Sequence, residues 1–428
     1  MTFDPTLSVL ALILLLLGAN FLCWLAFRLW PKLLLSENEL LAIDYLTRFE
    51  HELKPYIPEW FEITAEEWPD FVREYRQGET GPNIYKEFVE FTHPAYKGRY
   101  INFDPVGFRH GRNQGPWPVS PQHFNIFFFG GSTTLNVGPD WTAIPSLLQE
   151  ILNNRRAISR PIRVYNFGRG AWFSIQEKIL FELLLMAKAV PDMVIFLDGV
   201  NDCYFFDGKP ATASIYTNAL ANLNRDQYET KKSRTAARPK WQKLNEFIGS
   251  LPLARAINRA ADLYGGRTPL AHEAMYRPIP VAPELIAQCI DRYLENKRQI
   301  EAICRDRGIK AMFVWQPTPA YKYDLSRHVA LSRHYGLGGH ERGAVGYALF
   351  ARWLESHPAG DSFLWLADIQ EDETAPIYLD NMHYTAAFSR KIARHIAEAM
   401  FARGFIPAKP LTTPAAAITS DAAQPGAR

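Results

Sequence analysis

A serine follows two glycines at the end of an apolar run, in Asn125–Gly138 (NIFFFGGSTTLNVG). Continuous apolar runs are typical of strands buried in a parallel sheet, and Gly130 and Gly131 permit a sharp turn after the run. In an open parallel sheet, ligands bind beyond the carboxyl ends of the strands, where Ser132 would lie. Ser132 is therefore a candidate nucleophile, although serine at such a position also caps turns and helices.

A carboxylate and an imidazole lie three residues apart near the C-terminal end, in Asp380-Asn381-Met382-His383. A serine nucleophile needs a base to take its proton and a third group to orient that base. In a turn, this spacing brings the Asp380 and His383 side chains onto one side. Asp380 could instead cap the last helix, with His383 in its first turn. Together with Ser132, the pair fits acyl transfer, with His383 as base and Asp380 as its orienting group.

Acyl transfer also needs hydrogen-bond donors aimed at the developing oxyanion. The candidates are the side-chain amide of Asn201 in DGVND and backbone N–H groups at Ser132 and at Gly170 or Ala171 in NFGRGAWFS. Asn201 could instead cap a turn, a role to which asparagine is well suited. The motifs G-x-S-x-G, a Walker lysine and H-E-x-x-H do not occur. The sequence therefore predicts neither a cofactor nor a catalytic metal.

Five apolar runs predict the strands that position these residues, and amphipathic stretches between them predict helices. The predicted strands are Phe124–Phe129, Ile162–Gly168, Pro191–Gly199, Lys310–Pro317 and Phe363–Ile369. The predicted helices are Trp141–Leu152, Ser174–Ala189, Pro283–Arg307 and Thr385–Arg403, whereas Tyr321–His357 is expected to be irregular. This alternation is typical of a parallel sheet with helices on both faces. The candidate site residues follow the first, second, third and fifth strands.

Four short blocks occur in the order Ser, Gly, Asn, His: GGST, NFGRG, DGVND and DNMH. This order resembles the SGNH hydrolases, also called the GDSL esterase/lipase family, in which Gly-Gly-Ser is a common variant of Gly-Asp-Ser. The resemblance covers Tyr100–Gly404, apart from an insertion at Tyr204–Pro283. It implies a flavodoxin-like three-layer α/β/α sandwich with a five-stranded parallel sheet, the SGNH hydrolase fold.

The resemblance also implies roles for individual residues. Ser132 would be the nucleophile, His383 the base and Asp380 its orienting group, while Ser132, Gly170 and Asn201 would form the oxyanion hole. In the family, the glycine of the second block usually lies five residues after its asparagine, and this chain has Ala171 there. Because the donor is a backbone N–H, either Gly170 or Ala171 can supply it.

The expected activity is hydrolysis of ester bonds in an acyl-ester or acylated-glycan substrate. Two alternatives stay open. The same acyl-enzyme could pass its acyl group to a sugar hydroxyl, which would make the protein an O-acyltransferase on a glycan. A non-catalytic SGNH-like binding module is the other alternative, against which the intact set of candidate residues counts. A net charge of +2 argues against nucleic acid as a partner.

The N-terminal segment Leu7–Phe27 has about 21 residues and no formal charge, enough for a helix of about 30 Å, the thickness of a bilayer core. Trp24 lies near its end and Arg28 follows, as at a membrane interface. Because no positive region precedes the segment, an uncleaved single-pass anchor is favoured over a cleaved signal. The sequence therefore predicts a membrane protein, with the side of its catalytic domain left open.

The rest of the chain divides by composition. Residues 37–99 are polar and aromatic and predict helices and loops that connect the anchor to the body. Residues 100–404 form the predicted hydrolase domain, with the insertion at residues 204–283. Residues 409–428 are rich in Ala, Pro, Thr and Ser and predict a disordered tail. Four cysteines without paired spacing suggest neither a disulfide framework nor a zinc site.

Overall fold

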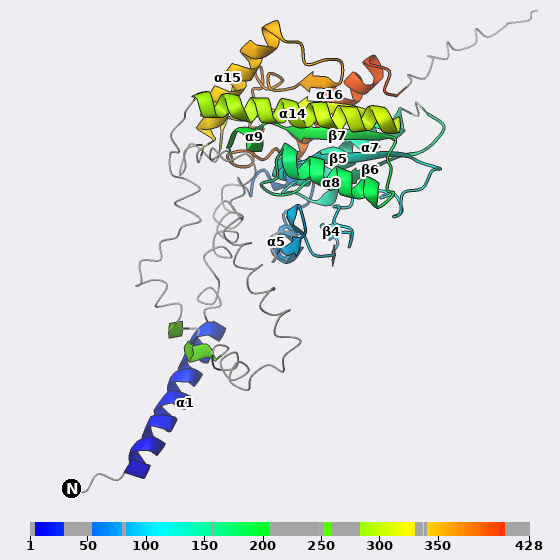
Figure 1. The fold of residues 1–428 in the computed structure, drawn as a ribbon. Coiled ribbons are helices and arrows are strands. Elements are labelled where there is room, and N and C mark those ends of the chain that lie inside the picture. The colour runs from blue at the N-terminus through cyan, green and yellow to red at the C-terminus, as the bar shows by residue number, and fades with distance from the viewer. Residues whose placement is uncertain are drawn as a thin grey trace, which may run out of the picture.

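A five-stranded parallel sheet forms the centre of the protein (Figure 1). The computed structural model describes residues 5–29, 54–78, 83–155, 158–204, 283–329 and 340–406, with 248, 251–254, 256–257 and 337. The strands are β5 (Phe124–Gly130), β6 (Ile162–Asn166), β7 (Met193–Asp198), β8 (Lys310–Trp315) and β9 (Phe363–Trp365). Their order is β6-β5-β7-β8-β9, and every neighbouring pair is parallel. Counted along the chain this order is 2-1-3-4-5, as in flavodoxin-like folds, and the predicted parallel sheet is confirmed.

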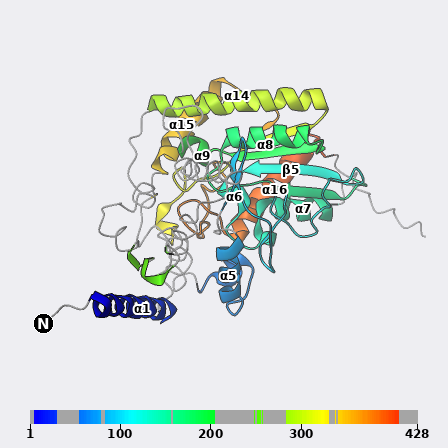
Figure 2. The same cartoon turned by 60° about the horizontal axis from the view of Figure 1, so that its bottom comes forward.

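Helices cover both faces of the sheet (Figure 2). One layer contains α7 (Ile144–Asn154) and α16 (Ala386–Ala402), and the other contains α8 (Ser174–Met186), α14 (Pro283–Arg307) and α15 (Glu341–Ser356). Successive residues of a strand point to opposite faces, so Ile126 and Phe128 pack in the α7–α16 layer. Phe127 and Phe129 pack in the α8–α14 layer. Both faces are apolar, which explains the continuous apolar runs in the sequence.

The expectation of an irregular Tyr321–His357 segment is wrong, because α15 occupies its second half. Two of the glycines that suggested a loop, Gly343 and Gly346, lie inside this helix. A Cβ atom at Gly346 would lie 2.5 Å from Cys203 Sγ, so this glycine allows α15 to pack closely against the chain after β7. Sequence patterns do not distinguish a glycine needed for close packing from one needed for a turn.

The described residues between 54 and 103 pack against the body. They contain α4 (Ile57–Phe61), α5 (Trp68–Gly78) and two antiparallel pairs, β1 (Ile84–Lys86) with β2 (Glu90–Thr92) and β3 (Tyr96–Lys97) with β4 (Asn102–Phe103). Aromatic residues of α4 and α5 share one apolar cluster with Leu135 and Leu379. Leu379 directly precedes Asp380, so this cluster supports both ends of the candidate site.

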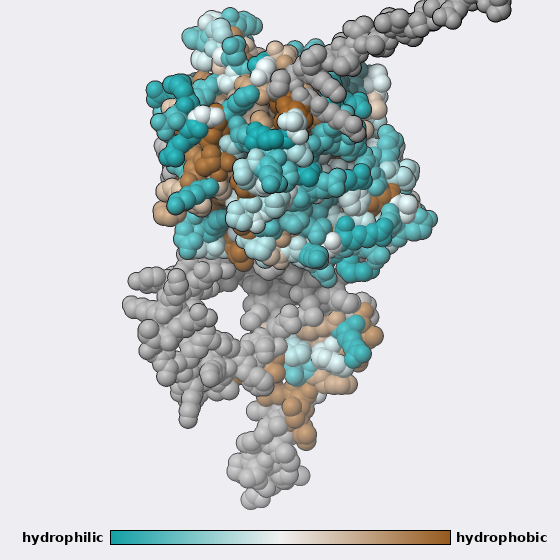
Figure 3. All heavy atoms as spheres, turned by 90° about the vertical axis from the view of Figure 1, so that its right-hand side faces the viewer, coloured by the Kyte–Doolittle hydropathy of each residue, from teal (hydrophilic) through white to brown (hydrophobic). Residues whose placement is uncertain are grey.

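Helix α1 (Pro5–Leu29) carries exposed apolar side chains, among them Leu14, Leu15 and Leu22. The face of the body in Figure 3 is mainly hydrophilic, with separate apolar patches. Within the part of the chain that the structure describes, no helix is both long and apolar enough to span a membrane. The anchor at Leu7–Phe27 stays a prediction. Most of the insertion at residues 204–283, residues 37–53 and the tail at 409–428 lie outside the described residues.

Candidate active site

Ser132 is the first residue of a short helix, α6 (Ser132–Leu135), which begins directly after β5 and Gly131. Gly131 O accepts hydrogen bonds from the backbone N–H groups of Thr134 and Leu135, which fixes the turn. The Ser132 hydroxyl donates to Met382 Sδ at 3.7 Å. Met382 lies in the predicted DNMH block, so the fold brings the serine turn and the Asp380–His383 loop together across 250 residues.

Asp380 and His383 form a close pair. His383 Nδ1 lies 2.5 Å from Asp380 Oδ2, and Asp380 is 3% exposed. The other carboxylate oxygen, Oδ1, accepts hydrogen bonds from the backbone N–H groups of Met382 at 2.7 Å and His383 at 2.6 Å. The alternative in which Asp380 caps the last helix, with His383 in its first turn, is wrong, because α16 begins at Ala386 and its cap is Thr385. With a proton on Nδ1, the basic nitrogen of His383 is Nε2.

A second histidine supports this loop and was not singled out from the sequence. His328 Nε2 donates to the backbone carbonyl of Asp380 at 2.7 Å, and its ring stacks on Tyr378 with centroids 5.8 Å apart. Burial lowers the pKa of His328 to about 4, so this side chain is neutral at physiological pH. Because its partner is a backbone carbonyl, no residue type in the sequence signals the contact.

Asn201 lies in α9 (Val200–Tyr204), which begins two residues after β7. Its side-chain Nδ2 donates to Trp172 O at 2.6 Å. A Cβ atom at Gly131 would lie 2.4 Å from this same Nδ2, so the amide is packed against the residue that precedes Ser132. An amide nitrogen has two hydrogens, and Trp172 O uses one of them. A side chain at residue 131 would therefore push the Asn201 amide out of this position.

We expect Gly131→Ala to displace the Asn201 amide, because a methyl group cannot occupy a site 2.4 Å from a nitrogen atom. If Asn201 donates to the oxyanion, kcat for ester hydrolysis should fall about 10²-fold or more, the usual effect of losing one donor. Gly343→Ala in α15 is the matched control, since its nearest neighbour would be Ala320 Cβ at 3.8 Å. Steady-state kinetics of both variants check the result. Equal activity of Gly131→Ala and wild type would exclude this role for Asn201.

The second block forms the turn after β6. Asn166 Nδ2 donates to Thr134 O at 2.9 Å, and its Oδ1 accepts from Gly168 N at 2.9 Å. A Cβ atom at Gly168 would lie 2.4 Å from Leu135 N, so this glycine allows the turn to pack against α6. The asparagine and first glycine of NFGRG therefore hold the serine helix in place.

The oxyanion candidates Gly170 and Ala171 differ in conformation. Ala171 has φ +61°, a left-handed conformation that favours glycine, whereas the space around Gly170 Cα is open. The conformation that favours glycine thus falls at residue 171, where this chain has alanine. Arg169, just before them, is fully buried and donates to Gly168 O and to Thr92 Oγ1. Burial lowers the pKa of Arg169 to about 9.

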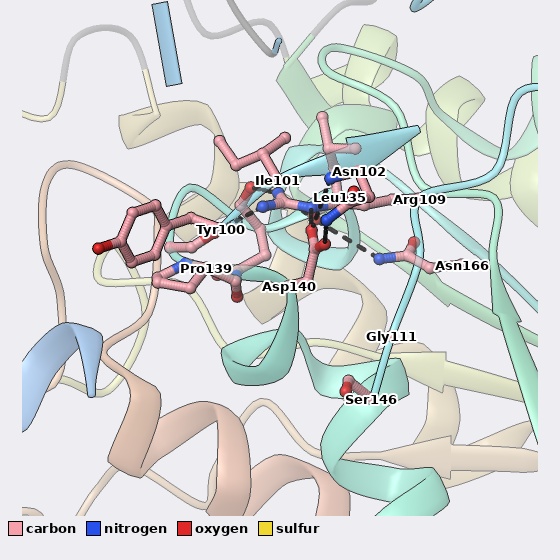
Figure 4. Close-up of polar contacts among 12 residues, drawn as sticks. Tyr100, Ile101, Asn102, Arg109, Gly111, Leu135, Pro139, Asp140, Ser146 and Asn166 are labelled. Atoms are coloured by element: carbon pink, nitrogen blue, oxygen red, sulfur yellow. Dashed lines mark hydrogen bonds and ion pairs between the residues drawn. The ribbon is translucent and has the colours of Figure 1, made fainter. Parts of the chain in front are cut away.

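Arg109 holds the chain that follows the serine helix (Figure 4). Its guanidinium is fully buried, and Nε lies 2.8 Å from Asp140 Oδ1. Nη1 donates to the carbonyls of Leu135, at 2.9 Å, and Asn136, and Nη2 donates to Gly138 O at 2.6 Å. Burial raises the pKa of Asp140, while the charge of Arg109 opposes that increase. No residue type in the sequence signals this role, because three of the atoms that Arg109 binds are backbone carbonyls.

Three buried carboxyl groups lie on the α8 side of the sheet, behind Asn201. Glu177 comes from α8, Asp198 ends β7 and Asp202 follows Asn201 in α9, and none is more than 3% exposed. Ser174 Oγ donates to Asp202 at 2.6 Å. Burial raises the pKa of each of the three carboxyl groups, and their mutual proximity raises those of Glu177 and Asp198 further. Nearby Arg292 lowers the pKa of Asp202 in part.

These raised pKa values predict that stability falls as pH rises. Groups whose folded pKa exceeds the unfolded value bind more protons when folded, so stability is lost from about pH 4 up through the folded pKa values. Each unit of difference corresponds to about 1.4 kcal/mol. We expect Glu177→Gln to flatten this dependence in thermal unfolding measured from about pH 4 upward. Glu182→Gln, on the surface of the same helix, is the matched control. A wild-type stability that rises over this range would contradict the prediction.

Among the described residues, no group of three or more His, Cys, Asp or Glu side chains is arranged to hold a metal ion. All four cysteines are free thiols.

No family model matches the sequence, and no curated protein matches it. Solved structures with partial similarity include an α/β hydrolase from the metagenome of Lake Arreo, Spain, at 13% identity and a TM-score of 0.33, covering 66% of this chain and 96% of the other. An acetyl xylan esterase has 12% identity and a TM-score of 0.33, and the similarity covers 64% of this chain and 98% of the other. A carbohydrate acetylesterase family member from Sinorhizobium meliloti has 13% identity and a TM-score of 0.31, and the similarity covers 65% of this chain and 98% of the other. Similarities of this size identify neither a family nor an activity for this chain.

Proposed function

We propose that the protein is a serine hydrolase of the SGNH type that acts on ester bonds. The observation that carries the proposal is the Asp380–His383 pair, 2.5 Å apart, in a loop whose Met382 contacts the Ser132 hydroxyl. A nucleophile, a base and an orienting carboxylate on neighbouring loops are the parts that acyl transfer needs. Their position beyond the carboxyl ends of β5 and β9 agrees with where open parallel sheets bind ligands.

In this proposal, the Ser132 hydroxyl turns from Met382 Sδ toward His383 and attacks the acyl carbon. His383 Nε2 takes the hydroxyl proton, and Asp380 stabilises the resulting imidazolium. The oxyanion accepts hydrogen bonds from Ser132 N–H, from Asn201 Nδ2 and from the backbone N–H of Gly170 or Ala171. His383 then returns the proton to the departing alcohol. A water molecule, activated by the same histidine, releases the acid and restores Ser132.

A fluorophosphonate probe tests the proposal without knowledge of the natural substrate. The folded protein should be labelled at Ser132, and labelling should disappear in Ser132→Ala and weaken strongly in His383→Ala. Peptide mapping identifies the labelled residue. Absence of labelling in the folded protein, together with no turnover of short-chain activated esters and acetylated sugars, would show that the site is not a serine hydrolase. Acyl transfer to an added saccharide in place of free acid would instead indicate the acyltransferase alternative.

On the sequence alone, we further propose that Leu7–Phe27 attaches the protein to a membrane as a single-pass anchor. The segment has no formal charge, and a helix satisfies its own backbone hydrogen bonds in lipid. Full-length protein is expected to stay in the membrane pellet through high-salt and alkaline carbonate washes. A variant that begins after Lys32 should be soluble. Extraction of the full-length protein by carbonate would count against an anchor.

A further inference from the structure

Gln316 lies at the carboxyl end of β8, the one strand of the main sheet to which the sequence assigned no site residue. It directly follows Trp315, the last residue of the strand, and is only 2% exposed. Its backbone N–H donates to Asp198 O at 3.0 Å, which continues the pairing of β8 with β7. The backbone of Gln316 is therefore fixed by the sheet, and its side chain starts from a rigid position.

The Gln316 side chain contacts the turn that carries the nucleophile. Thr133 Oγ1 donates to Gln316 Oε1 at 2.6 Å, and Thr133 directly follows Ser132 in α6. Thr133 is itself 5% exposed, so water does not readily replace the bond. A buried hydroxyl that loses its partner is costly, which favours a single position for this turn.

The same strand end also contacts the loop that carries the base. The hydroxyl of Tyr384 donates to Pro317 O at 2.6 Å and lies 3.3 Å from Gln316 Oε1. Tyr384 directly follows His383 and is 3% exposed. Gln316 Oε1 therefore faces the residue after the nucleophile and the residue after the base at once.

We propose that Gln316 is a positioning residue, which sets the distance between Ser132 and His383 by holding their neighbours Thr133 and Tyr384 on the end of β8. The inference rests on the proposed serine hydrolase function. The serine turn and the loop that carries the base lie 250 residues apart in the sequence, and the hydrogen bond from Ser132 to this loop ends on the flexible side chain of Met382. A rigid, buried connection is needed, because misplacement of reacting groups by about 1 Å costs about 10²-fold in rate.

Gln316→Met keeps the length of the side chain but removes its acceptor, so it tests the proposal directly. We expect kcat to fall about 10- to 100-fold while KM changes little, because substrate contacts are unaltered. The rate of fluorophosphonate labelling at Ser132 should fall in parallel. Gln316→Glu should recover much of the rate, since its carboxylate can still accept from Thr133 Oγ1. Gln122→Met, at an exposed glutamine, is the matched control and should behave as wild type.

Thr133→Val supplies an independent measurement if Gln316→Met does not fold. It removes the donor of the 2.6 Å bond and should lower kcat by a similar factor. In the Gln316→Met background, Thr133→Val should have no further effect, because the bond is already absent. Wild-type kcat in both single variants, or fully additive losses in the double variant, would overturn the proposal. Either result would leave the proposed hydrolase function intact as long as Ser132→Ala is inactive. Failure of the Gln316 proposal can therefore be distinguished from failure of the proposed function.

Discussion

Ser132→Ala is expected to lower kcat for ester hydrolysis by about 10³- to 10⁶-fold while leaving the fold unchanged. The side chain is partly exposed and, among the described residues, its hydroxyl makes one long hydrogen bond, to Met382 Sδ, so its removal breaks little structure. Without the hydroxyl no acyl-enzyme can form, and only binding and oxyanion stabilisation remain. Steady-state kinetics with an activated short-chain ester measure the loss, and circular dichroism verifies the fold.

Variants of the two proposed partners of Ser132 test the nucleophile assignment further. His383→Ala should cost about as much as Ser132→Ala, and the double variant should be no worse than either, because the two residues act as one unit. Asp380→Asn should lower kcat by about 10⁴-fold, since the His383 tautomer is then no longer fixed. Ser326→Ala, at an exposed serine whose hydroxyl donates to Asp324, is the matched control. Activity of Ser132→Ala comparable to that of the control would refute the nucleophile assignment.

Arg109→Met is expected to destabilise the protein by about 3–5 kcal/mol, the usual cost of breaking a buried ion pair by removing one partner. Asp140 would lose its charged neighbour, and three backbone carbonyls between Leu135 and Gly138 would lose their donor. Arg109→Lys should recover only part of the stability, because an ammonium cannot reproduce the guanidinium fork. Chemical denaturation provides the free energy of unfolding.

The matched control for this effect is Arg73→Met. Arg73 also pairs with an aspartate, Asp70 at 2.6 Å, but the side chains of both residues are more than half exposed. An exposed pair of this kind contributes about 0–1 kcal/mol. If both arginine variants change the free energy of unfolding equally, then burial of Arg109 does not stabilise the loop after Ser132 as we expect.

The sequence predicted strands and helices most reliably where a residue type serves one structural purpose. Apolar runs gave all five strands of the main sheet, although β9 ends at Trp365 rather than Ile369. The helix predicted at Pro283–Arg307 has those bounds in the structure. Helix α15 was missed because its glycines suggested a loop, whereas Gly346 serves close packing against Cys203. The sequence does not show which of these two purposes a glycine serves. The β1–β2 hairpin was missed because its strands have only three residues each.

The candidate site also contains residues that the sequence identified and contacts that only the tertiary structure shows. Residue type and order alone selected Ser132, Asn201, Asp380 and His383, because a nucleophile, an amide donor and a carboxylate–imidazole pair are chemically distinctive. Tertiary structure alone decided what surrounds them. Arg109 and His328 bind backbone carbonyls, Gln316 accepts from a threonine 183 residues away, and Glu177 meets Asp198 only when α8 packs on β7. These contacts depend on which segments the fold brings together, and local sequence patterns do not indicate partners that are distant along the chain.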